Sequence, residues 1–252
     1  MTAIRVVDVA KTFSGKREVR ALDAVSFTVA PGEFVAVLGP SGCGKSTLLR
    51  LIAGLVAPDP GGSIEVLGRA QHQPSDEVGV VFQTYNLLPW LTVEKNLRLV
   101  AEIKRLPDAE IASRIEPMLE MLRLTQFRDR FPHELSGGMR QRCALGQILI
   151  LRPQVLLLDE PFGALDALTR DQLNVELLRL WQESRRTVIL VTHSIAEAVF
   201  LADRVLVMSD RPGHIIRDLA IELPRPREPQ TTKGTLEFGR YVLELSRLMG
   251  VA

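Results

Sequence analysis

The sequence predicts an α/β fold in which a mostly parallel sheet is interrupted by a long helical insertion. Three observations lead to this prediction. Compact apolar runs typical of buried strands occur at residues 34–38, 155–158, 187–191 and 204–208. Residues 93–152, between the first two of these runs, carry a helical pattern instead. The chain has 252 residues, 46% of them hydrophobic, so it can fill one large core.

The remaining elements follow from alternation, turn signals and periodicity. A Gly-rich loop after residue 38 leads into a helix, and strand-like segments occur on both sides of that loop. An apolar stripe in the helical insertion is interrupted by Pro117, where we expect a break or kink. The further expected strands are 4–9, 25–29, 64–67 and 78–82; the helix after the loop is 46–53; and the stripe is Ile111, Ile115, Met118, Leu119 and Leu122.

The C-terminal part is expected to leave the core. Residues 210–213 form a predicted turn, residues 224–229 resemble a linker, and the tail carries apolar residues at helical spacing. We therefore expect one domain over residues 1–225, with the helical insertion at about 90–152. The tail, 226–252, is expected to form a short amphipathic helix that packs on its own domain.

Composition excludes several classes of protein. Lys and Arg number 31 against 30 Asp and Glu, and a net charge of +1 does not indicate a nucleic-acid partner. No stretch approaches the roughly 18 apolar residues of a spanning helix, and the N-terminus does not resemble a secretory signal. We expect a cytosolic chain that needs an embedded partner if it serves a membrane. Cys43 and Cys143 are expected to be free thiols.

The Gly-rich loop has the pattern G-x-x-x-x-G-K-[ST] between a predicted strand and a predicted helix. Glycines let the backbone close round phosphates, and the N–H groups of the loop and helix present positive charge to an anion. Lys45 adds a full charge for the terminal phosphates, and Ser46 offers a hydroxyl to Mg²⁺. The predicted nucleoside-triphosphate site is Gly39, Pro40, Ser41, Gly42, Cys43, Gly44, Lys45, Ser46 and Thr47.

Polar side chains end three other predicted strands. Asp159 is expected to hold Mg²⁺ through water, and Glu160 to polarise the attacking water as a general base. His193 is expected to contact the γ-phosphate. Gln83 is expected to bind the metal or a water and to report the γ-phosphate to the loop beyond it.

The segment at 135–142 reads Leu-Ser-Gly-Gly-Met-Arg-Gln-Arg. Ser136 is a good N-cap, and the glycines open a predicted helix to about Leu151 whose N-terminus can bind a second anion. With this segment, the sequence resembles the nucleotide-binding subunits of ATP-binding-cassette (ABC) transporters over residues 4–215. The resemblance rests on the phosphate loop, Gln83, residues 135–142, the strand 155–160, the Ala164-Leu165-Asp166 loop and His193, in that order.

The resemblance implies a P-loop NTPase core with an antiparallel β subdomain and an inserted α-helical subdomain. It implies an ATPase that uses ATP and Mg²⁺ and pairs head to tail with a second copy of itself. Each ATP would then lie between one phosphate loop and the Ser136, Gly137 and Gly138 of the other chain, with Asp166 coupling the two sites. Phe13 corresponds to the aromatic residue that stacks on adenine, and a core role for it stays open.

Cys43 carries a separate hypothesis. N–H donors around a thiol can lower its pKa. We therefore expect a reactive Cys43 that bound ATP shields from alkylation.

The stretch from Gln83 to Leu91 is apolar for a loop, and the resemblance implies that a membrane permease docks there. Trp90 is a candidate anchor of this interface. The strings at 84–93, 161–170 and 208–213 resemble bacterial importers of nitrate, aliphatic sulfonates and taurine. The implied protein lies at the cytoplasmic face of the inner membrane and drives uptake of a small anionic solute. A solute-binding protein is its indirect partner.

The alternative is a cytosolic cassette ATPase with a soluble partner, such as one in iron–sulfur cluster assembly. The apolar residues 88–90 argue against it, and co-purification with a membrane protein would decide. A DNA-repair ATPase would need a long coiled coil where only about 90 residues separate the phosphate loop from residue 136. A small-molecule kinase has no use for the segment 135–142.

Overall fold

Two sheets form the framework of the computed structural model, which describes residues 2–15, 18–82, 86–163 and 166–251. The larger sheet has the strand order β10-β9-β3-β8-β7-β6, in which β10 is antiparallel to β9 and the other neighbours are parallel. Its strands are β3 (Phe34–Leu38), β6 (Val78–Val81), β7 (Val155–Asp159), β8 (Thr187–Thr192), β9 (Arg204–Met208) and β10 (Ile215–Ala220).

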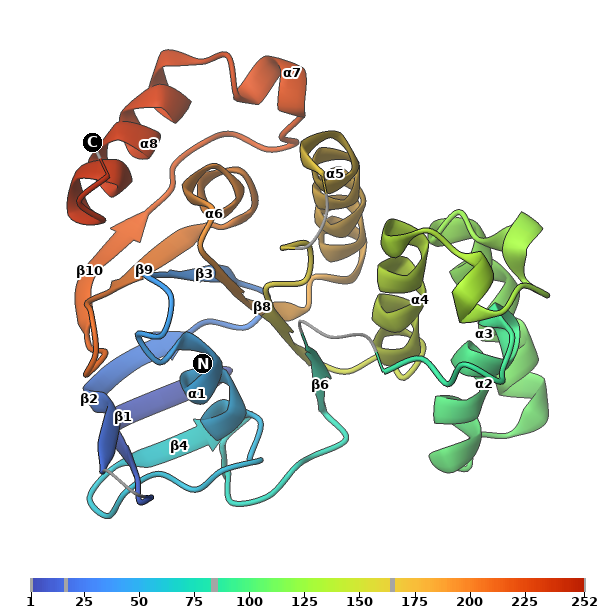
Figure 1. Cartoon of the computed structure of the whole chain (residues 1–252), viewed down its shortest axis with the longest axis horizontal. Coiled ribbons are helices and arrows are strands. Elements are labelled where there is room, and N and C mark those ends of the chain that lie inside the picture. Colours follow the sequence, from blue (N-terminus) through green and yellow to red (C-terminus); the bar gives the residue numbers. More distant parts are fainter. Residues whose placement is uncertain (1, 16–17, 83–85, 164–165, 252) are drawn as a thin grey trace.

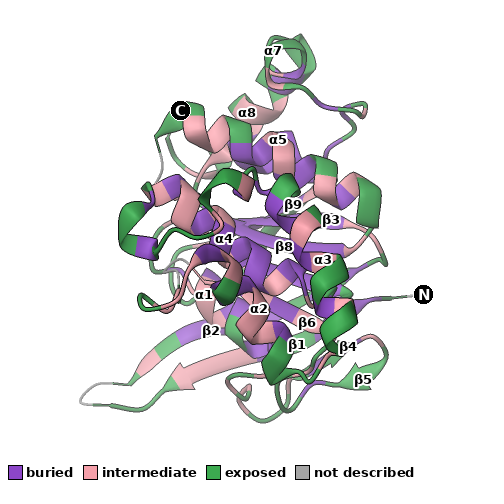
Figure 2. Ribbon diagram, turned by 90° about the vertical axis from the view of Figure 1, so that its right-hand side faces the viewer, coloured by how far each residue is buried: buried purple, intermediate pink, exposed green. Residues whose placement is uncertain are grey.

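The smaller sheet is antiparallel, with the order β2-β1-β4-β5. In its register Ile4 faces Val29 on one side and Val66 on the other. β1 and β2 run further than their alternation predicts, and their hairpin projects from the body of the molecule (Figure 2). The strands are β1 (Ile4–Phe13), β2 (Val19–Val29), β4 (Ser63–Val66) and β5 (Arg69–Ala70).

Helix α1 (Lys45–Ile52) packs between the two sheets, as Figure 1 shows. Alternate residues of β3 point to opposite faces of the large sheet. Val35 and Val37 join the core around α1 and the small sheet, while Phe34 and Leu38 join the core under the other helices. All residues of β3, β7 and β8 are therefore buried, which is why these strands are continuous apolar runs in the sequence.

The helical insertion forms a lobe beside the large sheet (Figure 1). The break expected at Pro117 is wrong, because the helix that contains it is continuous. Proline removes one backbone donor, but the burial of Ile111, Ile115 and Leu119 on the same helix stabilises the helical path. The lobe contains α2 (Val93–Ile103), α3 (Asp108–Met121) and α4 (Gly137–Leu149), with short 3₁₀ turns at Thr125–Phe127 and Pro132–Glu134.

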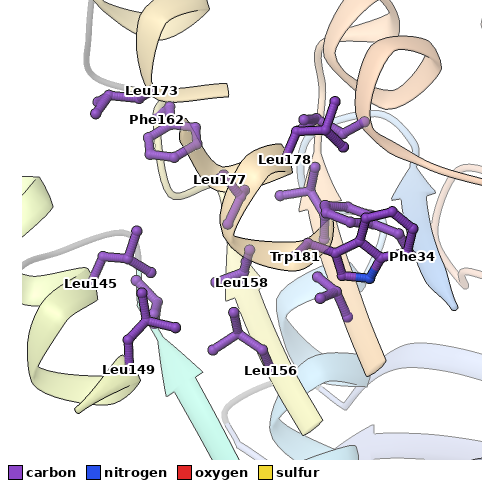
Figure 3. Close-up of a cluster of buried hydrophobic side chains, with 14 of the residues drawn as sticks. Phe34, Leu145, Leu149, Leu156, Leu158, Phe162, Leu173, Leu177, Leu178 and Trp181 are labelled. Carbon is purple, nitrogen blue, oxygen red and sulfur yellow. The ribbon is translucent and has the colours of Figure 1, made fainter. Parts of the chain in front are cut away.

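Leucines of α4 and of α5 (Ala167–Ser184) cover the β7 side of the sheet, as Figure 3 shows. Leu145 and Leu149 come from α4, and Leu177 comes from α5. The ring centroids of Phe34 and Trp181 lie 5.8 Å apart in a T-shaped arrangement. The lobe that carries α4 is thus joined to the strand that leads to the predicted catalytic acids.

The segment 224–229 is not the free linker that its composition predicts. Arg227 is only 3% exposed, and its guanidinium donates to carbonyl oxygens at the end of α6 (Ile195–Leu201) and after β10. These hydrogen bonds hold the segment on the core and lead to α7 (Pro229–Thr232) and α8 (Leu236–Leu248), where Phe238 and Leu245 are buried as expected for an amphipathic helix. The acceptors of the Arg227 guanidinium are the carbonyls of Val199, Phe200, Ala202, Ile221 and Leu223.

No helix in the described part of the chain combines the length and the apolar character needed to cross a bilayer.

Candidate nucleotide site

The carboxyl ends of β3, β8, β7 and β6 meet at one edge of the large sheet, because these neighbouring strands are parallel. The phosphate loop follows β3, Asp159 and Glu160 end β7, and His193 follows β8. The chain after β6 leads to Gln83, which lies outside the described residues. Three of the four polar groups expected at strand ends are therefore at the same edge.

The phosphate loop requires glycine at two positions. Gly42 has φ +79° and Gly44 has φ +107°, a region that disfavours other residues. A Cβ at Gly44 would also lie 2.7 Å from the carbonyl oxygen of Ala21. Lys45 is 4% exposed, and its Nζ donates to the carbonyl oxygens of Gly39 (2.7 Å) and Pro40 (2.8 Å). The loop thus wraps round a buried ammonium group at the start of α1.

Ser46 and Asp159 are joined by a hydrogen bond of 2.9 Å from Oγ to Oδ1. Burial raises the pKa of the Asp159 carboxyl, the hydrogen bond from Ser46 opposes this rise, and the charge of Glu160 adds to it. Hydroxyl and carboxylate oxygens are the ligands that Mg²⁺ prefers, and Mg²⁺ usually takes only one or two carboxylates beside substrate phosphates. The described residues contain no cluster of three or more His, Cys, Asp or Glu that could hold a metal. The hydroxyl of Ser46 and the single carboxylate of Asp159 suit a Mg²⁺ that is bound mainly by nucleotide phosphates.

Glu160 and His193 form the second polar pair. Oε2 of Glu160 lies 3.1 Å from Nδ1 of His193. Glu160 has φ +45°, which is unusual for a residue with a side chain. Its N–H donates to the carbonyl oxygen of Val191 at 2.9 Å, which ties this backbone conformation to β8. The turn at the end of β7 therefore brings the carboxylate to the pocket beside the imidazole.

A pocket of about 440 Å³ is lined by the phosphate loop and Glu160, while Asp159 and His193 are not among its lining residues. It contains the predicted residues Ser41, Gly42, Gly44, Lys45, Ser46, Thr47 and Glu160. Phe13 lines its rim and is 41% exposed, so this ring is not a core residue. Arg211, Val19 and Ala21 also line the pocket, and the motifs of the sequence do not point to them as nucleotide contacts.

The expectation of a reactive Cys43 is wrong. Cys43 is 1% exposed, and burial raises the pKa of its thiol, although the charge of Lys45 partly opposes the rise. A neutral buried thiol is a poor nucleophile. Cys43 is therefore a packing residue beneath the loop, in the same core as α1.

The segment 135–142 does not line this pocket. The Ser136 hydroxyl accepts the Met139 N–H at 3.3 Å and caps α4, which lies in the helical lobe (Figure 1). Gly137 and Gly138 begin that helix. Asp166 caps α5 by accepting the Thr169 N–H at 3.0 Å, and these backbone and side-chain hydrogen bonds lower the pKa of its carboxyl. The neighbouring Ala164 and Leu165 lie outside the described residues. One chain alone therefore does not bring Ser136, Gly137 and Gly138 to its own phosphate loop.

A phosphate loop at the carboxyl edge of a parallel sheet, beside a serine–aspartate pair and a glutamate–histidine pair, defines a P-loop nucleoside triphosphatase. The sequence profile of the family described as ABC transporter matches residues 22–163. The chain belongs to the ABC transporter family, and its cassette is one that binds and hydrolyses ATP.

Two relatives of named function agree with this assignment. The chain is 42% identical to an aliphatic sulfonates import ATP-binding protein of Bacillus cereus, over 96% of this chain and 94% of the relative. It is 41% identical to a nitrate import ATP-binding protein of Synechocystis, over 98% of this chain and 94% of the relative. The resemblance to the sulfonate and nitrate importer subfamily is thus confirmed.

A solved structure confirms the predicted fold class. It is the dimeric post-hydrolysis state of the ATP-binding cassette MJ0796 bound to ADP and Pi. The match has a TM-score of 0.76 and 31% identity, and it covers 88% of this chain and all of that one.

Proposed function

We propose that the chain is the ATP-hydrolysing subunit of an importer that drives uptake of a small anionic solute through a partner permease. One observation carries the proposal: a pocket lined by the phosphate loop and Glu160, in a chain that aligns over nearly its whole length with sulfonate and nitrate import ATP-binding proteins. The solute belongs to the aliphatic sulfonate, taurine or nitrate type. Passage of the solute through the membrane is assigned to the partner permease.

The pocket divides the work of hydrolysis among its groups. Lys45 and the N–H groups of the loop hold the β- and γ-phosphates. Ser46 and Asp159, with Gln83 as a further predicted ligand, would hold Mg²⁺, which would neutralise charge on the phosphates. Phe13 at the rim stacks on the adenine.

Glu160 acts as the general base, and His193 positions it. The carboxylate accepts a proton from the attacking water while the imidazole, 3.1 Å away, holds the carboxylate and contacts the γ-phosphate. The exposed His193 and the partly buried Glu160 are in contact, and we expect both to lie beside the terminal phosphate of bound ATP. This arrangement favours hydrolysis over transfer to a second substrate.

The complete site needs a second copy of the chain. Ser136, Gly137 and Gly138 lie in the helical lobe, away from their own phosphate loop, so they are available to the ATP of a partner copy. The N-terminus of α4 is expected to offer N–H groups to the γ-phosphate of that ATP. Asp166, exposed at the start of α5, couples the two sites. The dimeric form of the similar cassette MJ0796 supports this arrangement.

The loop before α2 is proposed to dock the permease at the cytoplasmic face of the membrane. Trp90 is 68% exposed although it is large and apolar. The buried Asn96 holds this loop, accepting the Leu88 N–H at 2.8 Å and donating to the Leu91 carbonyl oxygen at 2.9 Å. A rigid loop that presents an aromatic side chain is a suitable anchor for a partner. A solute-binding protein outside the membrane is the indirect third partner.

The test is affinity capture of the tagged chain from membranes, identification of the co-purifying permease, and transport by the reconstituted complex. We expect ATP-dependent uptake of a sulfonate, taurine or nitrate that stops with Glu160→Gln. Capture of a soluble scaffold and no membrane protein would contradict the importer function. It would favour the alternative, a cytosolic cassette ATPase of the kind that acts in iron–sulfur cluster assembly. Capture of a permease that moves none of these anions would overturn the solute class alone.

A further inference from the structure

Arg211 lines the nucleotide pocket from a loop that belongs to no nucleotide-binding motif. The loop connects β9 to β10, and its arginine shares the pocket with Ser41, Gly42 and Phe13. The side chain is exposed. Within the described part of the chain its guanidinium has no hydrogen bond or ion pair, so its position is not explained by a structural contact.

The backbone of this loop is held against the phosphate loop. Gly213 donates its N–H to the carbonyl oxygen of Ala21 at 3.0 Å and accepts the N–H of Asp23 at 3.0 Å, which ties it to β2. A Cβ at Gly213 would lie 2.1 Å from the carbonyl oxygen of Cys43, so the two loops touch through backbone atoms. The chain segment that carries Arg211 is therefore fixed relative to the phosphate loop without any nucleotide.

The Arg211 guanidinium lies over the phosphate loop itself. Its Nη2 is 3.5 Å from the position that a Cβ would take at Gly42. Because Gly42 has no side chain, nothing separates the guanidinium from the loop backbone that faces the phosphates. Lys45, the other cation of the pocket, already donates to two carbonyl oxygens. Arg211 thus adds donors that no described protein group uses.

We propose that Arg211 is a nucleotide-binding residue whose guanidinium pairs with a phosphate oxygen of bound ATP or ADP. Guanidinium stays charged at any working pH and presents five donors in a planar fork that suits phosphate. A charge-assisted hydrogen bond of this kind contributes about tenfold or more to an affinity. The inference rests on the proposed ATP-dependent function and extends its site to the β9–β10 loop.

The test compares nucleotide binding by the parent chain, Arg211→Gln and Arg211→Lys, with MgATP and MgADP as ligands in isothermal titration calorimetry. We expect Arg211→Gln to raise the Kd for both nucleotides about tenfold. Arg211→Lys should recover part of the loss, since lysine keeps the charge but not the fork. Arg240→Gln on α8 is the matched control, because Arg240 is also exposed and lies outside the pocket. Its Kd values should equal those of the parent.

The outcomes separate this inference from the proposed function. A parent chain that binds no ATP overturns both. A parent that binds ATP, with an Arg211→Gln chain of equal affinity for ATP and ADP, overturns only the assignment of Arg211. Equal affinities together with a loss of ATP-dependent dimerisation would assign Arg211 to the partner copy and overturn the phosphate contact as well. Thermal unfolding of each variant is the control for folding, and we expect midpoints equal to that of the parent because both substituted side chains are exposed.

Discussion

The carboxylate of Glu160 and the imidazole of His193 lie 3.1 Å apart although 32 positions separate them in the chain. β7 and β8 are neighbours in the sheet, with Asp159 opposite Val191. The two side chains therefore leave adjacent strand ends and meet there, and Glu160 also lines the nucleotide pocket. The proposed general base and the imidazole proposed to position it are thus in contact in the structure of the chain alone.

Glu160→Gln should keep ATP binding and lose hydrolysis. The amide has nearly the shape of the carboxylate but does not accept the proton of the attacking water, so kcat should fall by about 10²–10⁴. At saturating MgATP the variant should also accumulate as a dimer, because closed pairs no longer reopen by hydrolysis. Phosphate release and sedimentation velocity measure the two effects. Parent-like turnover, or a variant that stays monomeric with MgATP, contradicts the proposed mechanism.

His193→Ala should lower kcat by about 10²–10³, the usual effect of removing a group that stabilises developing charge. The affinity for ADP should not change, because ADP lacks the γ-phosphate that the imidazole contacts. His72→Ala is the control, since His72 is exposed and lies outside the pocket. An equal loss of ADP and ATP affinity in His193→Ala would show a structural role for the imidazole instead.

Cys143 should make the protein less stable at alkaline pH. Burial raises the pKa of its thiol to about 12, while an unfolded chain has a value of about 8.5. Between these two pKa values the thiol ionises in the unfolded chain but not in the folded one, so the free energy of unfolding falls as the pH rises. The loss begins above pH 8.5 and amounts to about 1.4 kcal/mol per pH unit up to pH 12.

Chemical unfolding of the parent and of Cys143→Ala from pH 7 to pH 10 measures this dependence. The alanine variant loses packing at every pH, so the difference in unfolding free energy between the two proteins should shrink above pH 8.5. A constant difference across the range would mean that the thiol ionises alike in the folded and unfolded chains.

Trp90→Ala should weaken capture of the permease. A buried aromatic anchor commonly contributes about 2 kcal/mol or more to an interface, equivalent to a roughly thirtyfold loss of affinity. Leu236→Ala is the matched control, because Leu236 is 81% exposed but lies on α8, far along the chain from the loop. Equal recovery of permease with both variants would exclude the Trp90 loop as the docking site.

Gly213→Ala should destabilise the protein and weaken nucleotide binding together. The added Cβ would lie 2.1 Å from the Cys43 carbonyl oxygen, so one of the two loops must move. Overpacking of this kind costs about 1–3 kcal/mol. Gly239→Ala adds the same methyl group to α8 with nothing within 4 Å, and it should cause no loss. A thermal shift assay without ATP measures the loss of stability, and the added shift with ATP measures nucleotide binding. Unchanged ATP binding by Gly213→Ala would show that the β9–β10 loop can move without disturbing the phosphate loop.

The local structure around many of the predicted site residues was predictable because it depends on short sequence patterns. The phosphate loop, the acids after residue 158 and the Ser136 cap depend on neighbours a few positions away, and the structure has each in the expected local form. The central strands were visible because they are buried on both faces, which makes them continuous apolar runs. β10 was not predicted, because its residues are mostly exposed and lack such a run.

The sequence by itself determined the class of chemistry. The residues predicted to hold a phosphate, a metal and a water occur at spacings that fold locally into a loop and strand ends. Only the tertiary structure decided which groups share the pocket and which are buried. It placed Arg211 over the phosphate loop, buried Cys43 and Arg227, and kept Pro117 within a helix. The physical reason is that burial, and the pKa values that follow from it, depend on contacts between segments far apart in the chain, which no local pattern encodes.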